Sequence, residues 1–123
     1  HTVLIIEDSE VYRQFLTTLV KKVFNANAVG FASPLKAFEW LDSNMPAFII
    51  LDMELPQMDG YSILKKIRAN SKTEKIPVVV CTALNSKDLV VRLVKVGISD
   101  FIDKRADVKT VAAKLKKIFE SLE

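Results

Sequence analysis

Charged and hydroxyl side chains stand at the ends of four short apolar runs in this sequence. The runs Val3–Ile6, Phe48–Leu51, Val78–Cys81 and Phe101–Asp103 have the length of β-strands. The polar residues that follow them are Glu7, Asp8, Asp52, Thr82 and Lys104. In an open parallel α/β sheet the carboxyl ends of all strands lie along one edge, where ligands bind. We therefore expect three carboxylates, a hydroxyl and an ammonium to share a small volume.

Carboxylates that are crowded together repel one another unless a proton or a hard cation neutralises them. Glu7, Asp8 and Asp52 offer only oxygen ligands, which suit Mg²⁺, or Mn²⁺ in its place. A carboxylate beside such an ion can act as a nucleophile toward phosphorus and form an aspartyl phosphate. Lys104 and Thr82 could then contact the phosphoryl oxygens. The residue types therefore indicate a site that makes and senses an acyl phosphate.

The glycine content of the sequence excludes the usual glycine-rich nucleotide-binding loops. The three glycines are Gly30, Gly60 and Gly97, and their spacing matches neither a dinucleotide-binding loop nor a P-loop. The turn after the first strand carries Glu7 and Asp8 instead, which would repel a bare phosphate.

Alternation of short apolar runs with segments of helical period predicts βα units and a parallel sheet. The expected strands are Val3–Ile6, about Ala28–Phe31, Phe48–Leu51, Pro77 to Cys81 and Asp100–Ile102. Helices are expected after Ser9, from Ser33-Pro34 to Leu41, over Tyr61–Arg68, after Ser86 and after Asp107. The apolar positions at helical spacing that we expect to face the core include Val11, Val23, Val94 and Val108.

The 123 residues suit one domain, and with 50% apolar and 27% charged residues they suit an ordinary globular protein. No apolar run approaches the ~20 residues of a membrane span. The net charge of +3 is concentrated in the last helix, without interleaved aromatic residues, so we do not expect nucleic-acid binding. The single cysteine, Cys81, lies in an apolar strand and is expected to be a buried thiol, which fits a cytoplasmic protein.

Four stretches of the sequence resemble the receiver domain of two-component response regulators. They are VLIIEDS, IILDMELPQMDGYSIL, IPVVVCTAL and GISDFIDK, and the resemblance covers nearly the whole chain. It implies one receiver domain over residues 1–123, with a flavodoxin-like, doubly wound sheet of five parallel strands in the order 2-1-3-4-5. It also implies a signalling module that a sensor histidine kinase or phosphotransfer protein phosphorylates, rather than an enzyme acting on a second substrate. The effector and any homodimer stay open.

The resemblance also assigns roles to individual residues. Asp52 would be the phosphoacceptor and, with Asp8, a direct metal ligand, while Glu7 would act through water and Glu54 through its backbone carbonyl. Thr82 and Lys104 would contact the phosphoryl group. The loop after Thr82 would shift on phosphorylation, and Phe101 would then fill the vacated space. This movement would change the surface formed by the last two helices and the strand between them.

Two residues depart from the common receiver pattern. Arg105 follows Lys104 where many receivers have proline, so we expect a less constrained loop there. The acidic Glu54 stands beside the expected path of water to the phosphoryl group, and we expect it to tune the lifetime of the phosphorylated state.

Two other classes of protein stay open from the sequence. One is a Mg²⁺-dependent phosphohydrolase with an aspartate nucleophile, although haloacid-dehalogenase enzymes carry Asp-x-Asp after their first strand, where this chain has Glu7-Asp8. The other is a degenerate receiver that acts as a constitutive interaction surface.

Overall fold

The computed structural model describes residues 1–83 and 86–122, which form a parallel five-stranded sheet in the order β2-β1-β3-β4-β5. The strands are β1 (Thr2–Ile6), β2 (Asn27–Phe31), β3 (Phe48–Leu51), β4 (Val78–Thr82) and β5 (Asp100–Asp103). The helices are α1 (Glu10–Thr18), its π-helical continuation η1 (Leu19–Val23), α2 (Pro34–Ser43), α3 (Gly60–Ala69), α4 (Lys87–Val96) and α5 (Val108–Ser121). The predicted fold class and strand order are confirmed.

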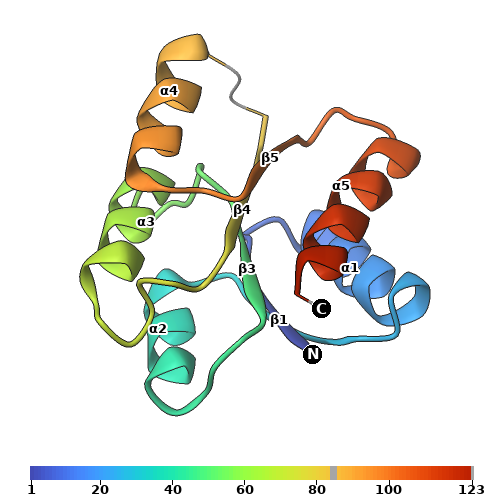
Figure 1. The fold of residues 1–123 in the computed structure, drawn as a ribbon, viewed down its shortest axis with the longest axis horizontal. Coiled ribbons are helices and arrows are strands. Elements are labelled where there is room, and N and C mark those ends of the chain that lie inside the picture. The colour runs from blue at the N-terminus through green and yellow to red at the C-terminus, as the bar shows by residue number, and fades with distance from the viewer. Residues whose placement is uncertain (84–85, 123) are drawn as a thin grey trace.

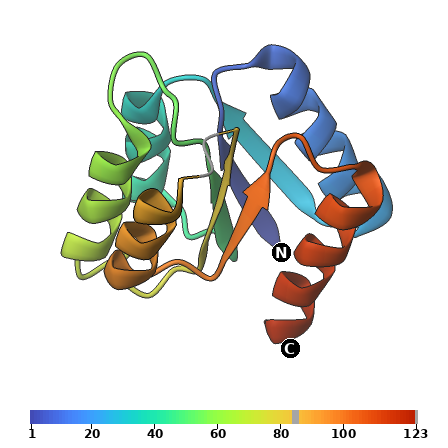
Figure 2. The same ribbon diagram turned by 90° about the horizontal axis from the view of Figure 1, so that it is seen from above.

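Helices cover both faces of the sheet, as Figures 1 and 2 show. On one face α2, α3 and α4 pack against residues such as Leu4, Ile49 and Val80. On the other face α1 and α5 pack against the alternate strand residues, such as Ile5 and Val79. The residues of β3 and β4 are buried throughout, because a central strand between two helical layers presents both of its faces to apolar side chains.

Helix starts follow the predicted capping residues. The side chains of Ser9, Ser33, Ser86 and Asp107 each accept a hydrogen bond from a backbone N–H in the first turn of the helix that follows. Asp59 caps α3 in the same way, through Ser62 N. Strands and helices therefore begin within about two residues of their predicted positions. Among the described residues, no helix is both long and apolar enough to cross a lipid bilayer.

Four valines that were predicted to face the core are exposed instead. Val11 and Val108 stand in the first turns of α1 and α5, with exposed fractions of 81% and 56%. Each lies on the solvent side of the first turn of its helix, whereas Tyr12, in the same turn as Val11, contacts Cys81 of β4. Val23 is exposed because the π-helical turn of η1 changes the angular spacing of residues and turns this side chain away from the sheet. Val94 is exposed because α4 buries a narrow stripe around Leu93.

Candidate functional site

Three carboxylates meet at the carboxyl edge of the sheet, where β1 and β3 end side by side. Ile6 pairs with Leu51, so the residues that follow each strand are brought together. Glu7, Asp8 and Asp52 each offer an oxygen, and these atoms all lie within 4.8 Å of one another. Glu7 and Asp52 are buried, whereas Asp8 is exposed. A set of hard oxygen ligands with one exposed member fits a divalent cation that keeps some of its water.

Lys104 reaches this cluster from the end of β5. Its Nζ atom lies 2.5 Å from Oε1 of Glu7 and 3.2 Å from Oδ2 of Asp52. Burial by itself would lower the pKa of Lys104, but the contact of its ammonium with the Glu7 carboxylate and the charge of Asp52 outweigh it and raise this pKa. The lysine therefore stays charged beside the two buried carboxylates.

Among the effects of this crowding is a raised pKa of Glu7. Burial raises its pKa from 4.5 to about 7, against the opposing effects of Lys104 and of the Ser9 N–H, and the neighbouring Asp52 adds to the rise. Oε2 of Glu7 accepts from Ser9 N at 3.0 Å, but Oε1 accepts no well-aligned hydrogen bond from the described residues despite its contact with Lys104. One ammonium faces three carboxylates, so a divalent cation in the cluster would balance the remaining negative charge. The residues present thus fit a metal ion.

The loop after β3 holds Asp52 in place. Oδ1 of Asp52 accepts a hydrogen bond from Glu54 N at 3.0 Å, and the Glu54 side chain is exposed. Gly60, at the start of α3, donates to the carbonyl of Met53. A Cβ atom on Gly60 would lie 2.5 Å from Met53 Cα and 2.8 Å from the Asp52 carbonyl oxygen. Only glycine therefore lets α3 start so close to the strand end, a role that the sequence analysis did not assign.

Thr82 and Phe101 lie on the same face of the sheet. Val80 pairs with Phe101, and Thr82 is two residues further along β4, so its side chain projects from the same face. Thr82 is fully buried, and its carbonyl accepts a hydrogen bond from Lys104 N at 3.1 Å. Phe101 is half-buried against the core beneath α4. The predicted shift of the loop after Thr82 concerns residues 84–85, which lie outside the described residues.

Arg105 closes the turn that follows β5. Its backbone N–H and its Nε both donate to Oδ1 of Asp103, at 2.8 and 2.9 Å, and its Nη2 donates to Oδ2 at 2.7 Å. These hydrogen bonds from Arg105 lower the pKa of Asp103 to about 2. Ala106 N adds a bond to the Asp103 carbonyl. The expectation of a less constrained loop is therefore not supported, because hydrogen bonds restrain the turn.

Two residues of α1 touch the site although the sequence analysis did not select them. Arg13 Nη1 donates to the carbonyl of Glu7 at 2.7 Å and fixes the turn that carries the acids. The ring of Tyr12 lies beneath Lys104, with Nζ 5.0 Å from the ring centroid. Their positions one helical turn after Asp8 and Ser9 place them near the acids, but the sequence does not tell which way each side chain points.

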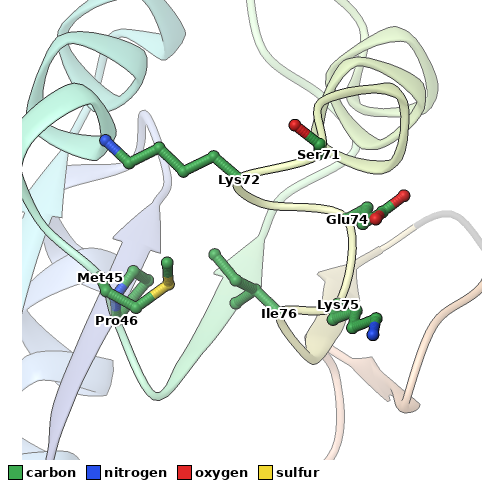
Figure 3. A pocket seen from close by; sticks show the side chains of 7 residues that line it. All are labelled: Met45, Pro46, Ser71, Lys72, Glu74, Lys75 and Ile76. Carbon is green, nitrogen blue, oxygen red and sulfur yellow. The ribbon is translucent and has the colours of Figure 1, made fainter.

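A hollow of about 400 Å³ lies at the opposite edge of the sheet from this cluster. Figure 3 shows the side chains that line it. It is lined by Met45, Pro46, Ser71, Lys72, Glu74, Lys75 and Ile76, which precede β3 and β4. It contains one carboxylate, from Glu74, and so does not offer the set of oxygen ligands found at the carboxyl edge.

Comparisons with known proteins agree with the fold. The response regulator receiver domain family matches residues 3–116. A protein-glutamate methylesterase/protein-glutamine glutaminase of Leptospira interrogans is 43% identical over 105 residues, which are 83% of this chain and 29% of that protein. This chain therefore spans less than a third of the length of that curated relative.

Solved structures of receiver domains have the same fold as this chain. The signal receiver domain of a histidine kinase from Syntrophus aciditrophicus has a TM-score of 0.86 and 26% identity, over 99% of this chain and 92% of that one. The Mn²⁺-bound form of the response regulator Rcp1 has a TM-score of 0.76 and 26% identity, over 95% of this chain and 90% of that one. The fold is that of a receiver domain of two-component signalling. The chain belongs to the response regulator receiver domain family.

Proposed function

We propose that this receiver is activated when Asp52 accepts a phosphoryl group from the phosphohistidine of a sensor histidine kinase or a phosphotransfer protein. The observation that carries the proposal is the position of Lys104 Nζ, 2.5 Å from Glu7 and 3.2 Å from Asp52, inside a cluster of three carboxylates. An ammonium held beside a buried carboxylate is placed to bind a phosphoryl group that is attached to that carboxylate.

The transfer requires a small number of bond changes. One carboxylate oxygen of Asp52 forms a P–O bond while the P–N bond of the donor phosphohistidine breaks, and the released imidazole takes up a proton. Lys104 compensates the charge of one phosphoryl oxygen, and the Thr82 hydroxyl donates to another. The chain acts on no second substrate and catalyses only its own phosphorylation and dephosphorylation.

The acidic cluster is the proposed site for Mg²⁺, with Mn²⁺ as a substitute. Asp8 and Asp52 would bind the ion directly, Glu7 through water and Glu54 through its backbone carbonyl. The bound ion would neutralise charge on the phosphoryl oxygens. The oxygen-only donor set, in which three carboxylates face one ammonium, supports this assignment. The Mn²⁺-bound form of a relative with the same fold also supports it.

The output would come from a change in the surface formed by α4, β5 and α5. Thr82 and Phe101 share a face of the sheet, so a movement of Thr82 toward a phosphoryl group would open space for the Phe101 ring. Val91 and Val94 of α4 are 53% and 63% exposed, and this suits a surface that binds an effector or a second copy. A change in the ratio of active to inactive conformers from 1:99 to 99:1 requires ~5.5 kcal/mol. Thr82, Lys104 and the metal would therefore have to act together. We propose that residues 1–123 form one receiver domain that undergoes this change.

The test is incubation with acetyl phosphate and Mg²⁺, followed by intact-mass spectrometry. We expect one phosphoryl adduct per chain, which Asp52→Asn abolishes. Asp42→Asn, a change to an exposed aspartate in α2, is the matched control and should keep the adduct. Repeated hydrolysis of p-nitrophenyl phosphate would instead indicate a phosphohydrolase. Absence of any adduct would indicate a constitutive interaction module.

A second experiment tests the role of the Glu54 side chain. Because this carboxylate is exposed beside Asp52, we propose that it affects the approach of water to the phosphoryl group. The half-life of the phosphorylated protein should change in Glu54→Ala and stay the same in Glu74→Ala, which alters an exposed glutamate at the opposite edge of the sheet. Equal half-lives for Glu54→Ala and the unmodified protein would refute this role.

A further inference from the structure

Tyr12 connects the site to the core between α1 and β4. Its ring lies beneath Lys104 Nζ at 5.0 Å, and the Cys81 thiol donates to its hydroxyl oxygen at 3.4 Å. The ring of Phe15 contacts it from the same helix, with centroids 5.3 Å apart. Tyr12 is half-buried and Cys81 is buried, so the ring has fixed neighbours on two sides.

These contacts restrict where the ammonium of Lys104 can lie. A lysine side chain has many rotamers, and the carboxylates of Glu7 and Asp52 attract its end from one direction. The face of an aromatic ring carries partial negative charge and attracts a cation, and more strongly where water is excluded. The Tyr12 ring therefore provides a third contact that keeps Nζ beside Asp52 instead of letting it extend into solvent.

Tyr12 also contacts the strand that carries Thr82. Cys81 directly precedes Thr82 in β4, and their side chains project from opposite faces of the sheet. The Thr82 carbonyl in turn accepts a hydrogen bond from Lys104 N at 3.1 Å. Tyr12 thus contacts both Lys104 and the end of β4, which carries Thr82. Lys104 and Thr82 are the two residues that would contact a phosphoryl group.

We propose that Tyr12 is a positioning residue for phosphorylation of Asp52, because its ring holds the Lys104 ammonium beside the acceptor carboxylate. This inference rests on the proposed function. The ring performs the positioning, so a phenylalanine at this position should retain the effect and an aliphatic residue should lose it.

The first test compares rates of adduct formation from acetyl phosphate and Mg²⁺. Tyr12→Phe should react within about twofold of the unmodified protein, and Tyr12→Leu about fivefold more slowly. A fivefold change corresponds to about 1 kcal/mol, which is within the range of a cation–ring contact. The control is Phe24→Leu, which removes a ring from the same core, where it stacks on Phe119 at 4.7 Å, and should leave the rate unchanged.

The second test reads the geometry without any phosphorylation. In the metal-free protein the Lys104 side-chain protons should show an upfield ring-current shift in the NMR spectrum. Tyr12→Phe should keep this shift, and Tyr12→Leu should remove it. If Tyr12→Leu does not fold, Tyr12→Met replaces it, because an unbranched side chain of similar length fills the same space without a ring.

The outcomes separate this inference from the function on which it rests. If the unmodified protein forms no adduct, both fail. If it forms the adduct and the variant without a ring reacts equally fast, the positioning role of Tyr12 is refuted while the proposed function stands. A slow Tyr12→Phe variant would also refute it, because the ring would not be the part that matters.

Discussion

Replacing Glu7 with glutamine should stabilise the metal-free protein at high pH and leave its stability nearly unchanged at low pH. In the folded protein, burial raises the pKa of Glu7 from 4.5 to about 7. The unfolded chain therefore ionises at this position first. Between pH 4.5 and about 7 the folded state binds more protons than the unfolded state, so the contribution of Glu7 to stability falls as the pH rises through this window.

The size of the effect follows from the same two values. At 1.36 kcal/mol for each pH unit, a rise from 4.5 to about 7 corresponds to about 3 kcal/mol, as an upper bound. The full loss in free energy of unfolding is present above pH 7, where Glu7 is ionised in both the folded and the unfolded state. It is absent below pH 4.5, where Glu7 is protonated in both. Glutamine resembles the protonated glutamate in shape and carries no charge, so Glu7→Gln avoids the cost at high pH.

The assay is urea denaturation in EDTA at pH 5 and pH 8, with the free energy of unfolding obtained by linear extrapolation. The gain from Glu7→Gln should be about 1–3 kcal/mol larger at pH 8 than at pH 5. Groups that behave alike in the two proteins cancel in the difference. Glu10→Gln, a change to an exposed carboxylate in α1, should give the same small effect at both values. An equal gain from Glu7→Gln at both pH values would refute the reasoning.

Three further predictions concern the surroundings of the site. Gly60→Ala should lower the free energy of unfolding by about 1–3 kcal/mol, because the added Cβ would lie 2.5 Å from Met53 Cα; an unchanged urea midpoint would contradict this. Arg105→Ala should raise the pKa of Asp103 from about 2 toward its ordinary value of 3.8, because it removes the side-chain hydrogen bonds from Arg105. NMR titration of the Asp103 carboxyl carbon measures this pKa, and a value that stays low would show that Arg105 is not the cause of the shift. Trp40 lies in α2, away from the acidic cluster, so its fluorescence should not change when beryllofluoride and Mg²⁺ are added, and a clear change would show that the switch extends to α2.

Much of the fold could be predicted because its signals are local. The apolar runs that form β1, β3 and β4 are buried on both faces, and Ser9, Ser33, Ser86 and Asp107 cap helices where the sequence placed them. The errors arose where burial depends on what lies beneath a helix. Val11 and Val108 have the right spacing for a core face, but each lies on the solvent side of the first turn of its helix.

The sequence by itself determined which residue types follow each strand, and parallel topology then required Glu7, Asp8, Asp52 and Lys104 to meet at one edge. Tertiary structure alone decided how these groups share charge: Lys104 lies closer to Glu7 than to Asp52, and burial raises the pKa of Glu7. Tertiary structure also brought the Tyr12 ring beneath Lys104. The physical reason is that strand order fixes where the backbone ends, whereas desolvation and ring contacts depend on how α1 and β5 pack around those ends.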